Sequence, residues 1–69
     1  MNKQVTEEDL KVLEELRYKT KSAFELTKIL ALIAFASGED IRHISKILHI
    51  SRKTIKRYVA EWCKKKDSR

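Results

Sequence analysis

The sequence predicts an all-α fold, in which a single domain is built from four helices. The chain has 69 residues, which is enough for one small domain and no more. It contains no proline and one glycine, a composition that excludes collagen-like and linker-like chains and most β-rich folds. Four segments, at about residues 6–19, 22–37, 40–49 and 51–66, combine helix start signals with apolar residues at helical spacing.

The first helix is expected to begin at Thr6, an N-cap residue followed by acidic residues that suit the positive end of a helix dipole. Asp9 lies at the capping-box position relative to Thr6. Val5 and Leu10 occupy the two positions of a hydrophobic staple. The apolar stripe expected to face the core consists of Leu10, Leu13 and Leu16.

The second helix is expected to begin at Ser22, which forms a capping-box pattern with Glu25. Gly38 follows the helix as a left-handed C-cap. Because its apolar residues cover most of the circumference, this helix is predicted to be buried on nearly all sides, either at the centre of the fold or against a second subunit. These residues are Phe24, Ile29, Leu30, Leu32, Ile33 and Phe35.

Two shorter amphipathic segments complete the fold. The third helix, Asp40 to His49, is expected to bury a stripe made of Ile41, Ile44, Ile47 and Leu48. The fourth begins at the N-cap residue Ser51 and is expected to turn four residues inward, with two core aromatics among them. These residues are Ile55, Tyr58, Val59 and Trp62.

Residues 41–59 have the layout of a helix-turn-helix. Two short helices that cross at roughly 90–120° need a small residue at the crossing point, and Ser45 lies there. Ile50 follows the turn as an apolar plug, and Ser51 then caps the second helix. The motif therefore predicts a tri-helical helix-turn-helix unit, completed by residues 22–37, with an additional N-terminal helix before it.

The motif reads IRHISKILHISRKTIKRYV. It resembles the helix-turn-helix of bacterial, archaeal and phage regulators, of DNA-invertase C-terminal domains and of transposase N-terminal domains, over about residues 22–63. The resemblance implies binding of double-stranded DNA. His49 stands where these motifs usually have glycine, and histidine tolerates positive φ less well than glycine. The turn is therefore expected either to be looser or to lack the left-handed residue.

A helical wheel of the fourth helix places a cationic face opposite its apolar face. Because Arg and Lys can reach guanine edges and a small residue can meet a thymine methyl, this face is predicted to enter the major groove. The groove residues are expected to be Arg52, Lys53, Lys56, Arg57 and Ala60. The phosphate contacts are expected to be Arg42, Lys46, Ser51, Thr54 and Lys64.

The net charge of +6 supports the same partner. Residues 1–36 are neutral overall, and residues 51–69 hold eight Lys+Arg against two Asp+Glu, so they carry the whole excess. A small transcriptional regulator that binds specific DNA sequences is the favoured interpretation. A homodimer through the N-terminal helices is also expected, because so short a chain buries little surface alone.

Several other properties are expected to be absent. The sequence contains no acidic triad, activated serine or phosphate-binding loop, so no enzymatic activity is expected. The single cysteine, Cys63, excludes a disulfide framework, and no zinc-binding spacing is present; no cofactor, metal or small-molecule effector is expected. The longest uncharged run, residues 29–38, is too short for a membrane span, and a cytoplasmic, DNA-associated location is expected.

Two alternatives remain open. The chain can be the DNA-binding module of a transposase- or invertase-type recombinase whose catalytic residues lie on another domain. It can also be a helical protein-interaction module that docks through the apolar second helix. The salt dependence of binding distinguishes the last alternative from DNA binding, because affinity that rests on phosphate contacts falls steeply as salt rises and the affinity of an apolar interface does not.

Overall fold

The four segments that the sequence marks as helices are helical in the computed structural model, which describes residues 5–67. They are α1 (Glu7–Lys19), α2 (Ala23–Ala36), α3 (Ile41–Leu48) and α4 (Arg52–Asp67). No strand occurs within these residues, so the all-α, four-helix prediction is confirmed. The observed bounds lie within a residue or two of the expected ones, largely because the capping residues stand outside each helix.

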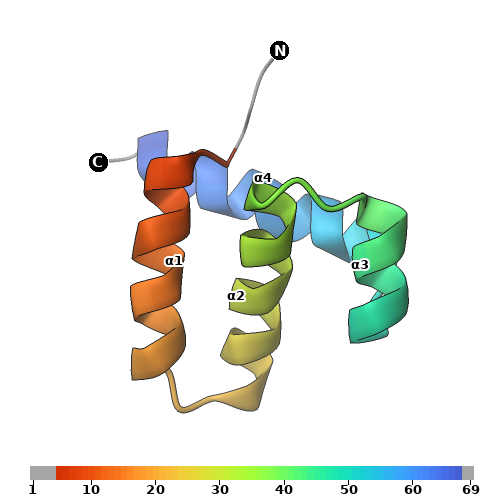
Figure 1. The fold of residues 1–69 in the computed structure, drawn as a ribbon, viewed down its shortest axis with the longest axis horizontal. Coiled ribbons are helices and arrows are strands. Elements are labelled where there is room, and N and C mark those ends of the chain that lie inside the picture. The colour runs from red at the N-terminus through yellow and green to blue at the C-terminus, as the bar shows by residue number, and fades with distance from the viewer. Residues whose placement is uncertain (1–4, 68–69) are drawn as a thin grey trace.

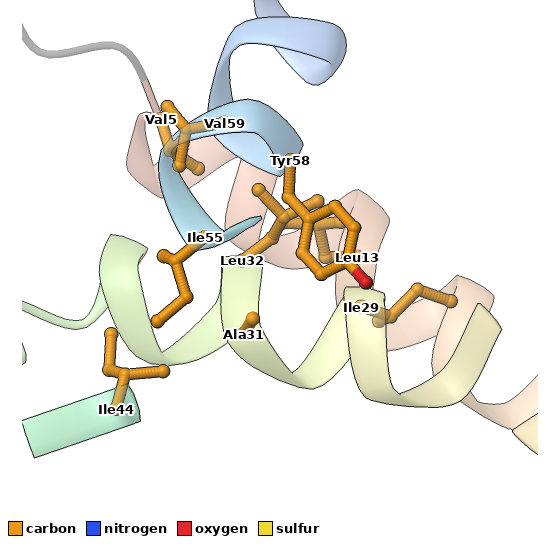
Figure 2. Close-up of a cluster of buried hydrophobic side chains, with 9 residues drawn as sticks. All are labelled: Val5, Leu13, Ile29, Ala31, Leu32, Ile44, Ile55, Tyr58 and Val59. Carbon is orange, nitrogen blue, oxygen red and sulfur yellow. The ribbon is translucent and has the colours of Figure 1, made fainter. Parts of the chain in front are cut away.

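Side-chain caps fix where α1 begins. Thr6 Oγ1 accepts a hydrogen bond from Asp9 N–H (3.2 Å), and Asp9 Oδ2 accepts one from Thr6 N–H (3.0 Å). The predicted capping box is therefore present. Val5, at the staple position before the cap, is 3% exposed and lies beside Val59 of α4 (Figure 2). The start of α1 is thus anchored to the last helix as well as to its own first turn.

The two ends of α2 are capped differently. Ser22 Oγ accepts from Glu25 N–H (3.4 Å), but the return bond of a capping box is missing, because Ser22 N–H donates instead to Thr20 Oγ1 (3.4 Å). At the other end, Gly38 has φ +97°, as expected for a left-handed C-cap. Its N–H donates to Phe35 O, and the next N–H donates to Ala34 O, which together satisfy two terminal carbonyls.

Helix α2 is the central element. In Figure 1 it stands between α1 and α3, and α4 crosses behind it. It packs against each of the other three helices. Ile29, Ala31 and Leu32 are buried in its middle, as the sequence predicts for a central helix. The prediction is wrong for Phe24, which is 67% exposed, because α3 and α4 lie toward the other end of α2 and do not cover its first turn (Figure 1).

The core draws on all four helices. Leu13, Leu32, Ile44 and Ile55 are almost completely buried, and Tyr58 and Val59 lie with them (Figure 2). Tyr58 is thus a core aromatic as predicted, while Trp62 is partly buried at the edge of the same cluster.

Two residues expected in the buried stripes are exposed. Leu16 of α1 is 37% exposed, although Leu13 one turn earlier is fully buried. Ile47 of α3 is 59% exposed, so its assignment to the buried stripe is wrong. Both helices lie at the sides of the fold, so a narrow stripe of each meets the core. Leu16 lines an unfilled cavity beside α2 and α4, and Ile47 lines a hollow beside α2, so neither side chain is fully covered.

Candidate nucleic-acid interface

The turn between α3 and α4 is closed by Ser45. His49, the C-cap of α3, is left-handed (φ 58°, ψ 41°), so the expectation of a turn without a left-handed residue is wrong. The N–H groups of His49 and Ile50 both donate to Ser45 O, the second at 3.3 Å. Ser45 Oγ in turn donates to Ile50 O at 2.5 Å. The turn is tied by both the backbone and the side chain of one residue, and is not loosened by the absence of glycine.

Helix α3 begins at a charged cap. Asp40 Oδ1 accepts from Arg42 N–H (2.9 Å), and Asp40 Oδ2 pairs with Arg42 Nη2 (3.1 Å). The Arg42 backbone hydrogen bond, followed by the guanidinium bond, lowers the pKa of Asp40 below its usual value of 3.8. Arg42, predicted to contact phosphate, is exposed but already has a carboxylate partner. Lys46, one turn further along α3, is exposed.

The first turn of α4 is capped by two hydroxyls. Ser51 Oγ accepts from Thr54 N–H (3.1 Å) and shares a hydrogen bond with Thr54 Oγ1 (2.9 Å). Two hydroxyls share one bond here, so one of their two hydrogens is left to donate elsewhere. The N-terminus of a helix also favours anions through its dipole and its free N–H groups. The phosphate contacts predicted for Ser51 and Thr54 therefore fit this geometry.

The structure confirms the predicted separation of the two faces of α4. Ile55, Tyr58 and Val59 are buried. The four cations assigned to the groove, Arg52, Lys53, Lys56 and Arg57, are exposed, as are Ala60 and Lys64. Cations on a surface that water reaches can exchange their hydration for phosphate oxygens or base edges.

Ala60, which is expected to meet a thymine methyl, lies at a hollow in the surface. Ala60 lines a hollow of about 650 Å³ together with Phe35, Ile41, Lys56 and Lys64. The hollow forms where α4 passes the end of α2 and the start of α3, because the small side chain leaves the space between them unfilled.

Glu61 is a feature of this face that the sequence reasoning missed. Its carboxylate pairs with Arg57 Nε (3.7 Å) on α4 and with Lys28 Nζ (3.3 Å) on α2. Lys28 Nζ also lies 5.8 Å from the centre of the Tyr58 ring. The spacing of Arg57 and Glu61, four residues apart on one helix, could have indicated the first pair. The second pair depends on the packing of α2 against α4.

The family comparison agrees with this geometry. The family model described as the homeodomain-like domain matches residues 22–67, which is most of the chain. The chain belongs to this homeodomain-like family. The family has a helix-turn-helix that binds DNA and occurs in transposases and in regulators. Searches of curated proteins and of solved structures found no match.

The matched residues separate the homeodomain-like unit from the rest of the fold. They contain α2, α3 and α4, with the helix-turn-helix formed by α3 and α4, while α1 precedes the match. The predicted tri-helical unit with an additional N-terminal helix is therefore the observed arrangement. Within residues 5–67, no cluster of three potential metal ligands is found. None of the helices in the same range has the length and hydrophobicity needed to cross a bilayer.

Proposed function

We propose that this homeodomain-like chain is a small transcriptional regulator that binds specific sequences in double-stranded DNA through α4. The observation that carries the proposal is the exposed cationic face of α4, opposite a buried face and next to a turn fixed by Ser45. A rigid turn matters because side chains that read bases must be held in register with the groove. We propose a cytoplasmic location for the protein, on the chromosome.

The proposed roles follow position along α4. Arg52, Lys53, Lys56 and Arg57 lie in its first two turns, the part of a recognition helix that usually meets base edges. Ala60 follows them and offers a methyl group to a thymine. The phosphate contacts come from Arg42 and Lys46 on α3, from the cap hydroxyls of Ser51 and Thr54, and from Lys64.

A double substitution tests the placement of α4. DNA affinity is measured on sites selected from a random pool, for the wild type and for the double variant Lys53→Ala with Arg57→Ala. The control is Lys11→Ala with Lys21→Ala, which removes the same charge near α1. Because each lost base contact should cost about 1–3 kcal/mol, the α4 variant is expected to bind the selected site at least about 30-fold more weakly. The circular dichroism should not change, because both side chains are exposed. Equal losses in the two variants would contradict the placement.

The chain is proposed to have no enzymatic activity of its own. The rival role, as the DNA-binding module of a recombinase, would place strand cleavage on another domain. Incubation of the protein with its selected site and Mg²⁺ is expected to leave the DNA uncut. Nicked or joined DNA would contradict the proposal, and a neighbouring reading frame that encodes a recombinase core would favour the rival.

Retention of binding to an apolar protein partner at high salt, without DNA binding, would favour an interaction module.

A homodimer through the N-terminal helices is a second part of the proposal. Large apolar side chains are exposed there, with Val12 47% and Tyr18 78% exposed on α1, and Phe24 67% exposed at the start of α2. Burying them against a second copy would stabilise a small fold and give two copies of α4 for two half-sites. Val12→Glu should then lower the mass found by sedimentation, and the selected DNA site should be palindromic. A wild-type monomer on a single half-site would contradict this part.

A further inference from the structure

A cavity of about 330 Å³ lies between α1, α2 and α4, among residues outside the proposed DNA contacts. Its inner wall consists of the buried side chains of Leu13, Ile29 and Leu32, and Leu16 and Trp62 also line it. Pockets that hold small ligands are about 300–1,000 Å³ and mostly apolar, with a few polar groups that fix the ligand. The cavity is at the small end of that range, so it suits a compact molecule with an apolar body.

The polar groups of the cavity are mainly cationic. Lys19, Lys28 and Lys65 line it, against one carboxylate, Glu25. Lys28 and Lys65, with Trp62, also line an adjoining hollow of about 400 Å³. These lysines come from three different helices, so their charges converge only in the folded chain. Such a rim attracts a ligand with a negatively charged end.

Trp62 adds an unsatisfied donor beside these lysines. Its Nε1–H is covered from solvent and has no hydrogen-bond acceptor in residues 5–67. A covered donor without an acceptor is unfavourable. The cavity therefore combines an apolar wall, to which the Trp62 side chain contributes, with a cationic rim.

We infer that this cavity binds a small amphiphilic carboxylate, a medium-length aliphatic or aromatic acid. The apolar body packs against Leu13, Ile29 and Leu32, and the carboxylate lies among the lysines of the rim. The same acid weakens DNA binding through Glu61, which pairs with both Lys28 and Arg57. A carboxylate that competes for Lys28 leaves Glu61 to Arg57 alone, and Arg57 is then less available to DNA. This regulatory step rests on the proposed function, whereas the binding of the acid does not.

Trp62 is the only tryptophan of the chain, so its fluorescence reports binding without DNA. The full chain is titrated with decanoate and, as an uncharged probe of similar length, with decanol. Decanoate is expected to change the fluorescence saturably, and decanol to bind at least about fivefold more weakly because it lacks the charge. The absence of a saturable change, or equal affinity for the two probes, would overturn the inference.

Two matched variants locate the site. Leu16→Glu places a charge at the cavity and should weaken decanoate binding by at least about tenfold. Lys11→Gln is the control, because it makes the same change in net charge at an exposed position on the same helix, and Lys11 does not line the cavity. Thermal melting followed by circular dichroism verifies that both fold. Equal losses in the two variants would overturn the assignment. A fall in sedimentation mass for Leu16→Glu, with no decanoate response in the wild type, would show that a second copy covers the cavity.

A DNA titration tests the regulatory step separately. Saturating decanoate should weaken binding of the selected site by up to about fivefold at constant ionic strength, the size of a surface ion pair. Glu61→Gln should remove this response while keeping the fluorescence change. Decanoate that binds without altering DNA affinity would overturn the regulatory step, and failure of the wild type to bind DNA at all would refute the proposed function instead.

Discussion

Glu61→Gln is the most informative single change on α4. It removes a carboxylate that pairs with Lys28 Nζ at 3.3 Å and with Arg57 Nε at 3.7 Å, and keeps a side chain of nearly the same shape. The two pairs differ in burial, because the Lys28 side chain is 29% exposed and the Arg57 side chain 74%. Because solvent screens the exposed Arg57 pair strongly, most of the contribution of Glu61 to the free energy of unfolding comes from its ion pair with Lys28 of α2.

The expected changes in stability and in DNA binding have opposite signs. Loss of both pairs should lower the free energy of unfolding by about 0.5–1 kcal/mol, which corresponds to a melting temperature about 2–8 °C lower for a domain of this size. Binding to a DNA duplex of arbitrary sequence should tighten, because Arg57 loses its competing carboxylate. If one more phosphate is neutralised, the slope of log K against log salt becomes steeper by about 0.9.

Fluorescence anisotropy with a labelled duplex, over roughly 50 to 200 mM salt, measures this slope. Glu14→Gln is the matched control, since it makes the same charge change at an exposed position on α1, away from α4. The control should change the slope little, because charges further away than a Debye length are screened. A slope for Glu61→Gln that equals that of the control, or a weaker complex at low salt, would refute the argument that Glu61 restrains Arg57.

Three further predictions concern the fold. His49→Gly should raise the free energy of unfolding by about 0.5–1 kcal/mol in urea denaturation, because glycine adopts the left-handed conformation of His49 without strain; a destabilised variant would contradict the observed φ of 58°. In the same urea denaturation, Ile55→Ala at a fully buried position should lower the free energy of unfolding by about 2–5 kcal/mol, whereas Ile47→Ala at a 59% exposed position should change it by no more than about 0.5 kcal/mol. Similar changes in the two variants would contradict the burial pattern. The lowered pKa of Asp40 contributes stability that is present above its unfolded value and lost as the pH falls through its folded value. Asp40→Asn, which keeps a capping side chain, should flatten the acid side of a melting-temperature profile from about pH 5 to 2, and an unchanged profile would argue against this ionic cap.

Local signals were sufficient to predict the helices. A cap such as that of Thr6 and Asp9 acts within one turn, so the residues that form it are adjacent in the sequence and can be recognised there. The same holds for Gly38, whose positive φ ends α2. His49 was harder to predict, because histidine can adopt the left-handed conformation at a cost, and that cost is offset here by hydrogen bonds within the turn.

Periodicity predicted the faces of α4 correctly but failed at the edges of the core. The apolar and cationic residues of α4 divide cleanly because one side of the helix meets the rest of the fold along most of its length. Ile47 and Phe24 have the same helical spacing as their buried neighbours and are nevertheless exposed. Helical spacing shows which residues share a face, but it does not show how far a neighbouring helix extends along that face.

The sequence by itself determined the four helices, the helix-turn-helix and the cationic face of α4, because caps, turns and helical periodicity are set by residues close together in the chain. The tertiary structure alone decided that Lys28 reaches Glu61, that Val5 packs beside Val59, and that lysines from three helices surround one apolar cavity. These contacts join residues that are distant in the sequence. Their existence depends on how α2 packs against α1 and α4, and no local pattern encodes that packing.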